Sequence, residues 1–384
     1  MTRVARLAAI AIMLGNTALV FPAFSQAPAC TVSPTGRSIA LQATGVDGTV
    51  FSVAGGYHLA VSVNGSDPAG VMVDTGSNAL IVPSWKIKGF PKDPDNDHSG
   101  MVVSGKLPYG YSSSGNSYNG YLIQVPVRVH GAGGTSVDAE DVQVFAITEV
   151  CGSDKHCVAA TSINSRSVGM MGVGFQPTPN LVVKVAGGGT APATHTNVFQ
   201  QVHGVATQGW IFEPGGRIVV GLNTETTQGF SAWAPMVPAS RGGMSPEGCV
   251  RVTEPGKPES RPLCGTMLLD TGMSTMNLWV YSGEQGQAPF CPPPPASKAG
   301  FDGATFPPGT TVTLASPGKA AALDYRFDTA GGTGKGAPEA TYCTNVKGAS
   351  ASENAFFNTG RMPLELYSFA RNETCGTFAY RPRQ

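Results

Sequence analysis

A short pattern occurs twice in this chain, at positions far apart in the sequence. Residues 71–77 read VMVDTGS and residues 267–274 read MLLDTGMS, so an apolar run leads into Asp-Thr-Gly each time. One such carboxylate would be an ordinary loop residue. Two of them on matching local sequence predict one site built from two halves, in which Asp74 and Asp270 meet and share a proton.

The composition favours a large folded protein made of many short strands. A chain of 384 residues is long enough for two domains or one bilobal body. Glycine (50) and proline (30) are abundant and charged residues make up only 13%, but 41% of the residues are hydrophobic and recur in short runs between turn residues. The formal net charge is zero and the sequence contains no basic patch, so we do not expect a nucleic-acid partner.

The N-terminus has the pattern of a secretory signal. Arg3 and Arg6 precede an apolar run over 7–20, and small residues at 23–25 fit a cleavage site, so 1–25 is predicted to be a signal peptide. No later segment is long and apolar enough to span a membrane. We therefore expect an exported protein, either periplasmic or extracellular, with a short segment at 26–56 preceding the first lobe.

The cysteine count is eight, an even number that suits an oxidising compartment. Sequence does not fix the connectivity, but neighbouring positions favour two local pairs and leave two long-range ones. The predicted pairs are Cys151–Cys157, Cys249–Cys264, Cys291–Cys343 and Cys30–Cys375. A metal knuckle at 151–157 is the alternative for the first pair, although its spacing does not match common zinc sites.

Local patterns predict the organisation of the two halves. A hairpin is expected over 57–74 with a turn at Asn64-Gly65, a second hairpin over 106–129, and a short helix at 197–202. Segments 187–196 and 240–262 have loop composition. The repeated motif predicts an N-terminal lobe at 57–205, which contains Asp74, and a C-terminal lobe at 206–384, which contains Asp270.

The chemistry of paired carboxylates gives each residue of the motif a role. Two carboxylates that share one proton can act as general base and general acid on water and a leaving group. The glycines permit close approach of the two loops, the threonines can hydrogen bond to the opposite loop, and the serine can donate to its own aspartate. The predicted catalytic and supporting residues are Asp74, Thr75, Gly76, Ser77, Asp270, Thr271 and Gly272.

On these motifs the chain resembles the pepsin-like aspartic endopeptidases, as a secreted member of bacterial type, from about Tyr57 to Pro382. Residues 111–122 resemble the flap hairpin, with Tyr111 as its tyrosine, Tyr109 as the alternative and Gly115 at the tip; 170–172 and the C-terminal strands also match. The resemblance implies a mostly β, bilobal fold with two six-stranded-type lobes and a central cleft. It further implies hydrolysis of extended polypeptides by activated water, no cofactor or metal, and a monomer.

Three positions depart from the family pattern. Met273 stands where the family usually has Thr or Ser, so Asp270 is expected to lose a hydroxyl partner and to carry the shared proton. Ile81 stands where a Trp usually supports the flap tyrosine, and Asn358 stands where a second close-approach glycine is expected. The segment before Tyr57 is also too short, and not basic enough, for the long pro-segment of pepsin zymogens.

Alternatives remain at this point. The aspartates could be capped turn residues of a non-enzymatic β protein, and Tyr111 could be a plain hairpin-tip aromatic. A catalytically weak protein that binds peptides on the same fold is the main rival function, motivated by Met273 and Ile81. A glycosidase with two carboxylates has no reason to place both in Asp-Thr-Gly turns.

Overall fold

The structure, a computed structural model, describes residues 32–383 apart from gaps at 112–114, 153, 166, 175–180, 186–187, 206, 231, 240–242, 282–290, 293–302, 317–322, 330–335 and 347–354. The predicted signal peptide at 1–25 and Cys30 therefore lie outside the described residues. The same is true of the tip of the predicted flap at 112–114.

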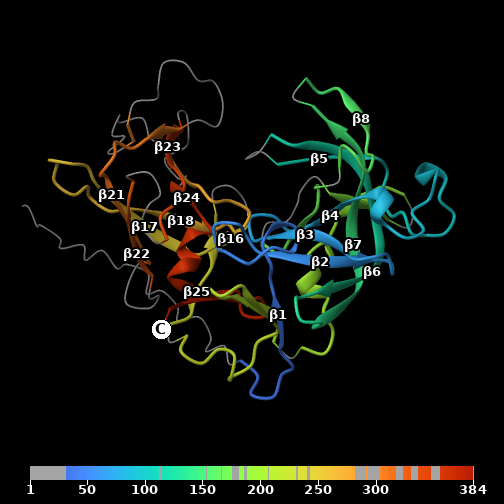
Figure 1. Cartoon of the computed structure of the whole chain (residues 1–384), viewed down its shortest axis with the longest axis horizontal. Coiled ribbons are helices and arrows are strands. Elements are labelled where there is room, and N and C mark those ends of the chain that lie inside the picture. The colour runs from blue at the N-terminus through green and yellow to red at the C-terminus, as the bar shows by residue number, and fades with distance from the viewer. Residues whose placement is uncertain are drawn as a thin grey trace, which may run out of the picture. The chain divides into compact units, whose positions relative to one another are not determined.

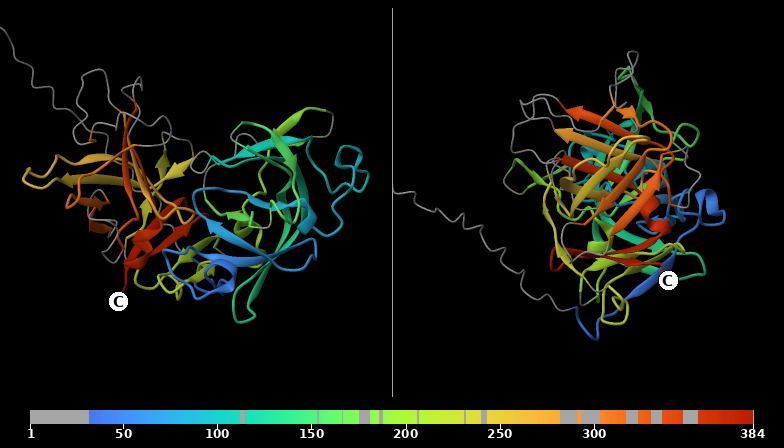
Figure 2. Two further views of the ribbon diagram at one scale, coloured as in Figure 1. Left: turned by 45° about the horizontal axis from the view of Figure 1, so that its top comes forward. Right: turned by 90° about the vertical axis from the view of Figure 1, so that its left-hand side faces the viewer.

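The N-terminal half forms an eight-stranded sheet that closes on itself (Figures 1 and 2). A second pairing, between β6 and β7, joins the strands β6, β2, β3, β9, β4 and β7 into a ring. Strands β5 and β8 lie outside this ring, which accounts for the larger strand number than the six expected. The strand order is β5 (Leu107–Gly110), β6 (Ser117–His130), β2 (His58–Val63), β3 (Ala69–Asp74), β9 (Met170–Gly172), β4 (Leu80–Pro83), β7 (Ser136–Cys151) and β8 (Cys157–Ala159).

The predicted hairpin that leads to Asp74 is present. Strands β2 and β3 pair antiparallel, and Asn64 and Gly65 between them have φ values of 53° and 70°. Two successive left-handed residues make the tight turn whose twist matches that of the flanking strands, and Asn-Gly is the preferred pair for it. This turn places the end of β3, and with it Asp74, in the interior of the sheet.

The C-terminal half forms a second eight-stranded sheet. Its centre repeats the arrangement around Asp74. In the first sheet, β3 pairs parallel with β9, and β9 pairs antiparallel with β4. In the second sheet, β18 pairs parallel with β24, and β24 pairs antiparallel with β19. The strand order is β20 (Ala304–Thr305), β23 (Thr341–Val346), β19 (Met276–Tyr281), β24 (Ala355–Gly360), β18 (Leu263–Leu269), β17 (Glu247–Thr253), β21 (Thr311–Ala315) and β22 (Asp324–Asp328).

A third sheet of six strands combines segments from both ends of the chain. Its order is β1 (Ile39–Gln42), β13 (Arg217–Val220), β12 (Gly209–Phe212), β25 (Tyr367–Asn372), β26 (Thr377–Pro382) and β14 (Ala234–Pro235). Trp210 in β12 is buried, and its indole N–H donates to the carbonyl of Val173, next to the end of β9. This sheet therefore supports the strand that passes behind Asp74.

Two predicted loops contain strands. Within 240–262, residues 247–253 form β17, whose alternating exposed and buried side chains are typical of a strand with one buried face. Within 187–196, residues 190–192 form β11 (Thr190–Pro192), which pairs with β10 (Val182–Lys184). The Gly-rich and polar composition of these segments therefore misled the prediction, because pairing partners elsewhere in the chain decide their conformation.

The remaining elements are short. A two-stranded pair joins β15 (Val237–Pro238) and β16 (Met244–Ser245). The helix predicted at 197–202 is the 3-10 turn η4 (Val198–Gln201), and the other 3-10 turns are η1 (Val46–Gly48), η2 (Ser84–Lys86), η3 (Pro94–Asn96) and η5 (Met362–Glu365). Among the described residues, none of the helices has the length and apolar character needed to cross a membrane.

Three predicted disulfides are present. Cys151–Cys157 and Cys249–Cys264 each join directly opposed residues of neighbouring strands, β7 with β8 and β17 with β18. The long-range pair Cys291–Cys343 is also formed. Cys375 is disulfide-bonded as well, while its predicted partner Cys30 lies outside the described residues. The cysteines at 151 and 157 thus form a covalent staple and not a metal knuckle.

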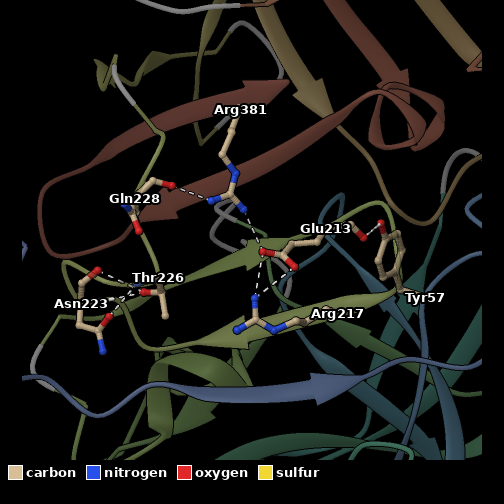
Figure 3. A network of polar contacts seen from close by, with 7 residues as sticks. All are labelled: Tyr57, Glu213, Arg217, Asn223, Thr226, Gln228 and Arg381. Carbon is tan, nitrogen blue, oxygen red and sulfur yellow. Dashed lines mark hydrogen bonds and ion pairs between the residues drawn. The ribbon is translucent and has the colours of Figure 1, made fainter. Parts of the chain in front are cut away.

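A polar network ties the first lobe strand to the six-stranded sheet (Figure 3). The Glu213 carboxylate accepts hydrogen bonds from Arg217 at 3.1 and 3.2 Å and from Arg381 at 3.0 Å. The backbone carbonyl of Glu213 accepts one from the hydroxyl of buried Tyr57 at 2.8 Å, and Arg381 also donates to the carbonyl of Gln228. Segments from three parts of the chain therefore meet at one residue.

Replacing Glu213 by Ala should lower the free energy of unfolding by only about 1 kcal/mol, since partly exposed ion pairs contribute little and the Tyr57 bond to the backbone is retained. Thermal unfolding of the variant measures this. A Glu213→Gln variant, which keeps one acceptor oxygen, is the matched control and should lose less. A loss above about 3 kcal/mol would contradict this small contribution.

Candidate active site

Two loops with the same sequence meet where β3 and β18 end. In each loop the strand runs directly into Asp-Thr-Gly, so the chain turns immediately after a buried, well-fixed segment. Asp74 and Asp270 are 5% and 6% exposed. The aspartates that the sequence pairs are thus two largely buried carboxylates held on opposing loops.

Four reciprocal hydrogen bonds lock the two loops together. The Thr75 N–H donates to the Thr271 hydroxyl and the Thr271 N–H donates to the Thr75 hydroxyl, both at 3.0 Å. Each hydroxyl then donates to a carbonyl of the opposite strand, Thr75 to Leu269 and Thr271 to Val73, the latter at 2.7 Å. The predicted cross-loop role of the two threonines is confirmed, and both side chains are buried.

The glycines of the two motifs lie against the opposite carboxylates. A Cβ atom on Gly76 would stand 2.6 Å from the Asp270 carboxyl carbon, and one on Gly272 would stand 2.7 Å from an Asp74 oxygen. Real Cβ atoms do not approach other atoms this closely, so any side chain here would force the loops apart. Glycine at both positions is what allows the carboxylates to be neighbours.

The Asp74 carboxylate has the two donors expected from the sequence. The Gly76 N–H donates to one oxygen at 2.7 Å, and the Ser77 hydroxyl donates to the other at 2.6 Å. Hydrogen bonds to a carboxylate favour its charged form. Each oxygen of the Asp74 carboxylate therefore has one donor.

The Asp270 carboxylate has a donor that the sequence analysis missed. Its first oxygen accepts from the Gly272 N–H at 2.9 Å, as in the other loop. Its second oxygen accepts from the side-chain amide of Asn358 at 2.6 Å. The Asn358 amide oxygen itself accepts from the Gly360 N–H at 2.9 Å, which fixes which end of the amide points at Asp270. Asp270 thus has no hydroxyl partner from position 273, as expected, but the Asn358 amide donates in its place.

Asn358 also has a different place from the one expected. It lies in β24 and is not among the residues with positive φ, so no left-handed conformation is involved. Gly360 is the close-approach glycine: its φ is +60°, and a Cβ there would stand 2.4 Å from the Thr275 carbonyl oxygen. Gly172 meets the equivalent loop after Asp74 in the same way. A register shift between β18 and β24 separates these positions, and sequence alone did not reveal it.

The protonation of the pair is uneven. Burial, reinforced by the negative charge of Asp74, raises the pKa of Asp270 well above the usual range for aspartate. A hydrogen bond between the two carboxyl groups adds to the rise, while the Asn358 and Gly272 donors oppose it. This direction agrees with the expectation that Asp270 carries the shared proton, but the cause is burial and not a missing hydrogen bond.

The predicted flap hairpin is formed by β5 and β6, with Tyr109 opposite Tyr118 and a Tyr111 N–H bond to the Asn116 carbonyl at 2.9 Å. Tyr111 and Tyr109 contact edge to face, with ring centroids 5.2 Å apart. Gly115 has a φ of +72°, and its N–H donates to the Tyr111 carbonyl, which closes the described part of the tip. Both rings pack on an apolar cluster that includes Ile81, where a Trp was expected.

The Tyr111 hydroxyl faces the site without a firm partner. It is buried and makes no hydrogen bond of acceptable geometry to the described residues. Burial raises its pKa well above the ordinary tyrosine value, and Tyr109 and Asp74 add to the shift while Ser77 opposes it. Burial also raises the pKa of Tyr109 to about 12. Both tyrosines are therefore neutral near the dyad, and Tyr111 has an unused donor.

A groove of about 1430 Å³ lies on the N-terminal half beside the flap. Its lining includes Tyr111, Ile81, Met72 and Met170, the last two being register partners in β9 and in β3, the strand that ends at Asp74. The aspartates themselves do not line it. Among the described residues, no cluster of three or more His, Cys, Asp or Glu side chains is arranged to hold a metal ion.

The fold is similar to that of two solved structures. The crystal structure of aspartic proteinase from Irpex lacteus matches with a TM-score of 0.52 and 13% sequence identity, covering 91% of this chain and 98% of that chain. The chain has the pepsin-like bilobal fold. The crystal structure of Basic 7S globulin from soybean matches with a TM-score of 0.50 and 13% identity, over 91% of this chain and 97% of that one.

The pepsin-like fold confirms the predicted mostly β, bilobal class. No family model matches the chain, and no curated protein matches it. At 13% identity the structural similarity establishes the fold alone. The function of the protein therefore depends on the chemistry of the site.

Replacing Asn358 by Leu should lower kcat/KM about 10-fold or more and move the acidic limb of its pH profile upward. The reason is that a donor to Asp270 is lost, and such bonds to charged groups are worth about 1.5–3 kcal/mol. The pH dependence of peptide cleavage measures both effects.

A second substitution tests the assignment. Met273→Thr in the Asn358→Leu background offers a hydroxyl at the position equivalent to Ser77 in the first loop, and it should restore part of the lost activity. Unchanged activity and pH profile in Asn358→Leu would show that this amide does not influence the dyad.

Proposed function

We propose that this protein is an exported aspartic endopeptidase that cleaves extended polypeptide segments. The carrying observation is the pair of mutually locked Asp-Thr-Gly loops, in which each carboxylate lies against the glycine of the other loop. A capped turn aspartate in an inert β protein has no need of this reciprocal contact. The similarity to an aspartic proteinase structure and the disulfides support the proposal.

The uneven pair supplies both halves of the chemistry. Ionised Asp74 takes a proton from the attacking water, while protonated Asp270 gives its proton to the carbonyl oxygen of the substrate. As the resulting tetrahedral diol collapses, Asp74 gives its proton to the leaving nitrogen and Asp270 takes a proton back from a diol hydroxyl, which regenerates the initial state. Ser77 stabilises the charge on Asp74, and burial keeps the proton on Asp270.

The flap contributes by closing over the peptide. Tyr111 stands at the base of the tip with a buried, unused hydroxyl, which could donate to a substrate backbone. The groove beside it offers methionine side chains at 72 and 170 to an apolar substrate residue. We propose the lobes at 57–205 and 206–384, each contributing one aspartate, as the two walls of the substrate site.

A peptide-binding protein without appreciable activity is the second candidate. The similarity to a structure named as a globulin, and Ile81 in place of a supporting Trp, favour it. A statine-containing peptide, whose hydroxyl mimics the tetrahedral intermediate, separates the two. We expect the protein to bind this peptide and to cleave a fluorophore-quencher peptide between about pH 3 and pH 7, a range that spans paired carboxylate titrations.

The outcomes of that pair of measurements are distinct. Binding of the statine peptide without any cleavage would favour the binding protein. Neither binding nor cleavage, in a protein shown to be folded by circular dichroism, would contradict both candidates. A statine peptide with the hydroxyl removed is the control for contacts that do not involve the dyad.

A further inference from the structure

A buried arginine stands directly behind the dyad. Arg361 follows the close-approach glycine Gly360 and is 8% exposed. Its Nη1 donates to the Thr271 carbonyl at 3.3 Å, and its Nε donates to the Ala54 carbonyl at 3.0 Å, which Nη2 also contacts. The guanidinium therefore bridges the residue after Asp270 to the segment that precedes β2.

The charge of this guanidinium has no direct ion pair. No carboxylate of the described residues lies within salt-bridge distance of Arg361. Two neutral carbonyls accept three hydrogen bonds from it but do not compensate its charge, and an uncompensated buried charge is strongly unfavourable. A negative group at longer range must therefore offset it.

Three carboxylates and one phenol act on Arg361 through space. Burial lowers the pKa of Arg361, and Glu339, Asp270, Asp74 and Tyr57 each oppose that shift, in decreasing order. Glu339 is exposed, so water and salt screen its effect, and its carboxylate is already engaged by the Ser274 hydroxyl at 2.7 Å. The dyad is buried and holds one negative charge when it shares a proton.

Burial also shifts the pKa values of the other titratable groups that Arg361 acts on. Burial raises the pKa of Tyr57, and the nearby charge of Glu213 adds to the rise. Burial lowers the pKa of His58, and Arg361 contributes to that lowering while Asp47 opposes it. From the flap side, Tyr109 and Tyr111 are neutral as described above.

We propose that Arg361 is a positioning residue whose buried positive charge is the counter-charge of the singly ionised dyad. This inference rests on the proposed function: the charge of Arg361 sets the pH range over which the dyad is singly ionised. The guanidinium favours each more negative state of the aspartate pair, because the attraction between opposite charges is reciprocal. The same guanidinium donates to the Thr271 carbonyl, so it also helps to fix the loop that carries Asp270.

The sign of the effect follows. The acidic limb of the kcat/KM profile reports the first ionisation of the dyad, and the alkaline limb reports the second. Loss of a nearby positive charge makes both ionisations harder. A neutral residue at 361 should therefore move both limbs to higher pH, whereas a merely structural defect would lower the activity without moving them.

The test separates the effect of the positive charge at position 361 from the effect of the side chain's shape. Arg361→Met removes the charge and fills the space, Arg361→Gln is a second neutral variant that retains a donor for the Ala54 carbonyl, and Arg361→Lys keeps the charge. Arg326→Gln, at an exposed position on β22, is the matched control for losing an arginine elsewhere. Two readouts are used: the pH profile of peptide cleavage, and the titration of the aspartate carboxyl carbons by carbon-13 NMR.

We expect the neutral variants to move both limbs, and the carboxyl titrations, upward by about half to one pH unit, with Arg361→Lys and Arg326→Gln close to the parent protein. Equal shifts in Arg361→Lys and the neutral variants, or no shift in any of them, would overturn the proposal. If the parent protein cleaves no peptide, the proposed function fails, but the carboxyl titrations still decide the role of Arg361.

Discussion

Replacing either Asp74 or Asp270 by Asn should reduce kcat for peptide cleavage by about 10⁴-fold, the upper range for loss of a general acid or base. Asn has nearly the same shape as Asp, so the loops and their glycine contacts are retained. What is lost is the base in one variant and the proton donor in the other. Cleavage of a single defined peptide, with product separated by chromatography, measures the change.

Stability provides the control for this prediction. The pKa of Asp270 is raised in the folded protein, so its folded form binds protons more tightly than its unfolded form. The corresponding stability is fully present below the unfolded pKa of about 3.9 and is lost as pH rises through the folded pKa. Asp270→Asn removes this loss, so the variant should unfold at the same temperature as the parent protein or higher at pH 7.

A lower unfolding temperature in Asp270→Asn would mean that reduced activity reflects misfolding and not lost chemistry. Comparable cleavage by the parent protein and both Asn variants would show that the two aspartates do not form the reacting pair. Glu339→Gln, which neutralises an exposed carboxylate near the site, is the matched control and should retain most of the activity.

Replacing Thr75 by Val should lower the free energy of unfolding by about 3 kcal/mol, since a buried carbonyl of Leu269 and a buried N–H of Thr271 both lose their partner. For a chain of this size the unfolding temperature should fall by roughly 4 °C. The activity should fall as well, because the loops would no longer be held at the separation that lets the carboxylates share a proton. Differential scanning calorimetry and peptide kinetics measure the two effects.

Thr75→Ser is the matched control, because it keeps the hydroxyl and loses only a methyl group. We expect it to be much closer to the parent protein in both measurements. If Thr75→Val and Thr75→Ser lose the same stability, the methyl contact and not the hydrogen bonds would hold the loops. Thr271→Val should behave like Thr75→Val, since its hydroxyl makes the equivalent bonds to Thr75 and Val73.

The predictable part of this site is the part encoded by local sequence. Asp-Thr-Gly after an apolar run specifies a strand, a tight turn and a carboxylate, and its second copy specifies the partner. The hydrogen bonds between Thr75 and Thr271 could also be predicted, because two copies of one motif that meet place the same residue of each loop opposite the other loop. The hairpin with Asn64-Gly65 and the two local disulfides were predictable for the same reason, whereas Cys291–Cys343 followed only because those two pairs left it over.

The rest depends on register between segments distant in the chain. Asn358 was assigned to the wrong role because the shift between β18 and β24, which makes Gly360 the close-approach residue, leaves no local trace. Arg361 was missed because an arginine in a connection between elements is usually exposed, and only the fold shows that this one is buried against the loop that carries Asp270. The signal that could have drawn attention is a polar Asn358 within the apolar strand β24 and an arginine, Arg361, directly after it.

The most direct test of the central claim is digestion of a peptide library by the purified protein between about pH 3 and pH 7, with Asp74→Asn and Asp270→Asn as blanks and the products identified by mass spectrometry. The account predicts internal cleavages by the parent protein that are absent from both blanks. A folded parent protein that produces no cleavage, or blanks that produce the same cleavages, would contradict it.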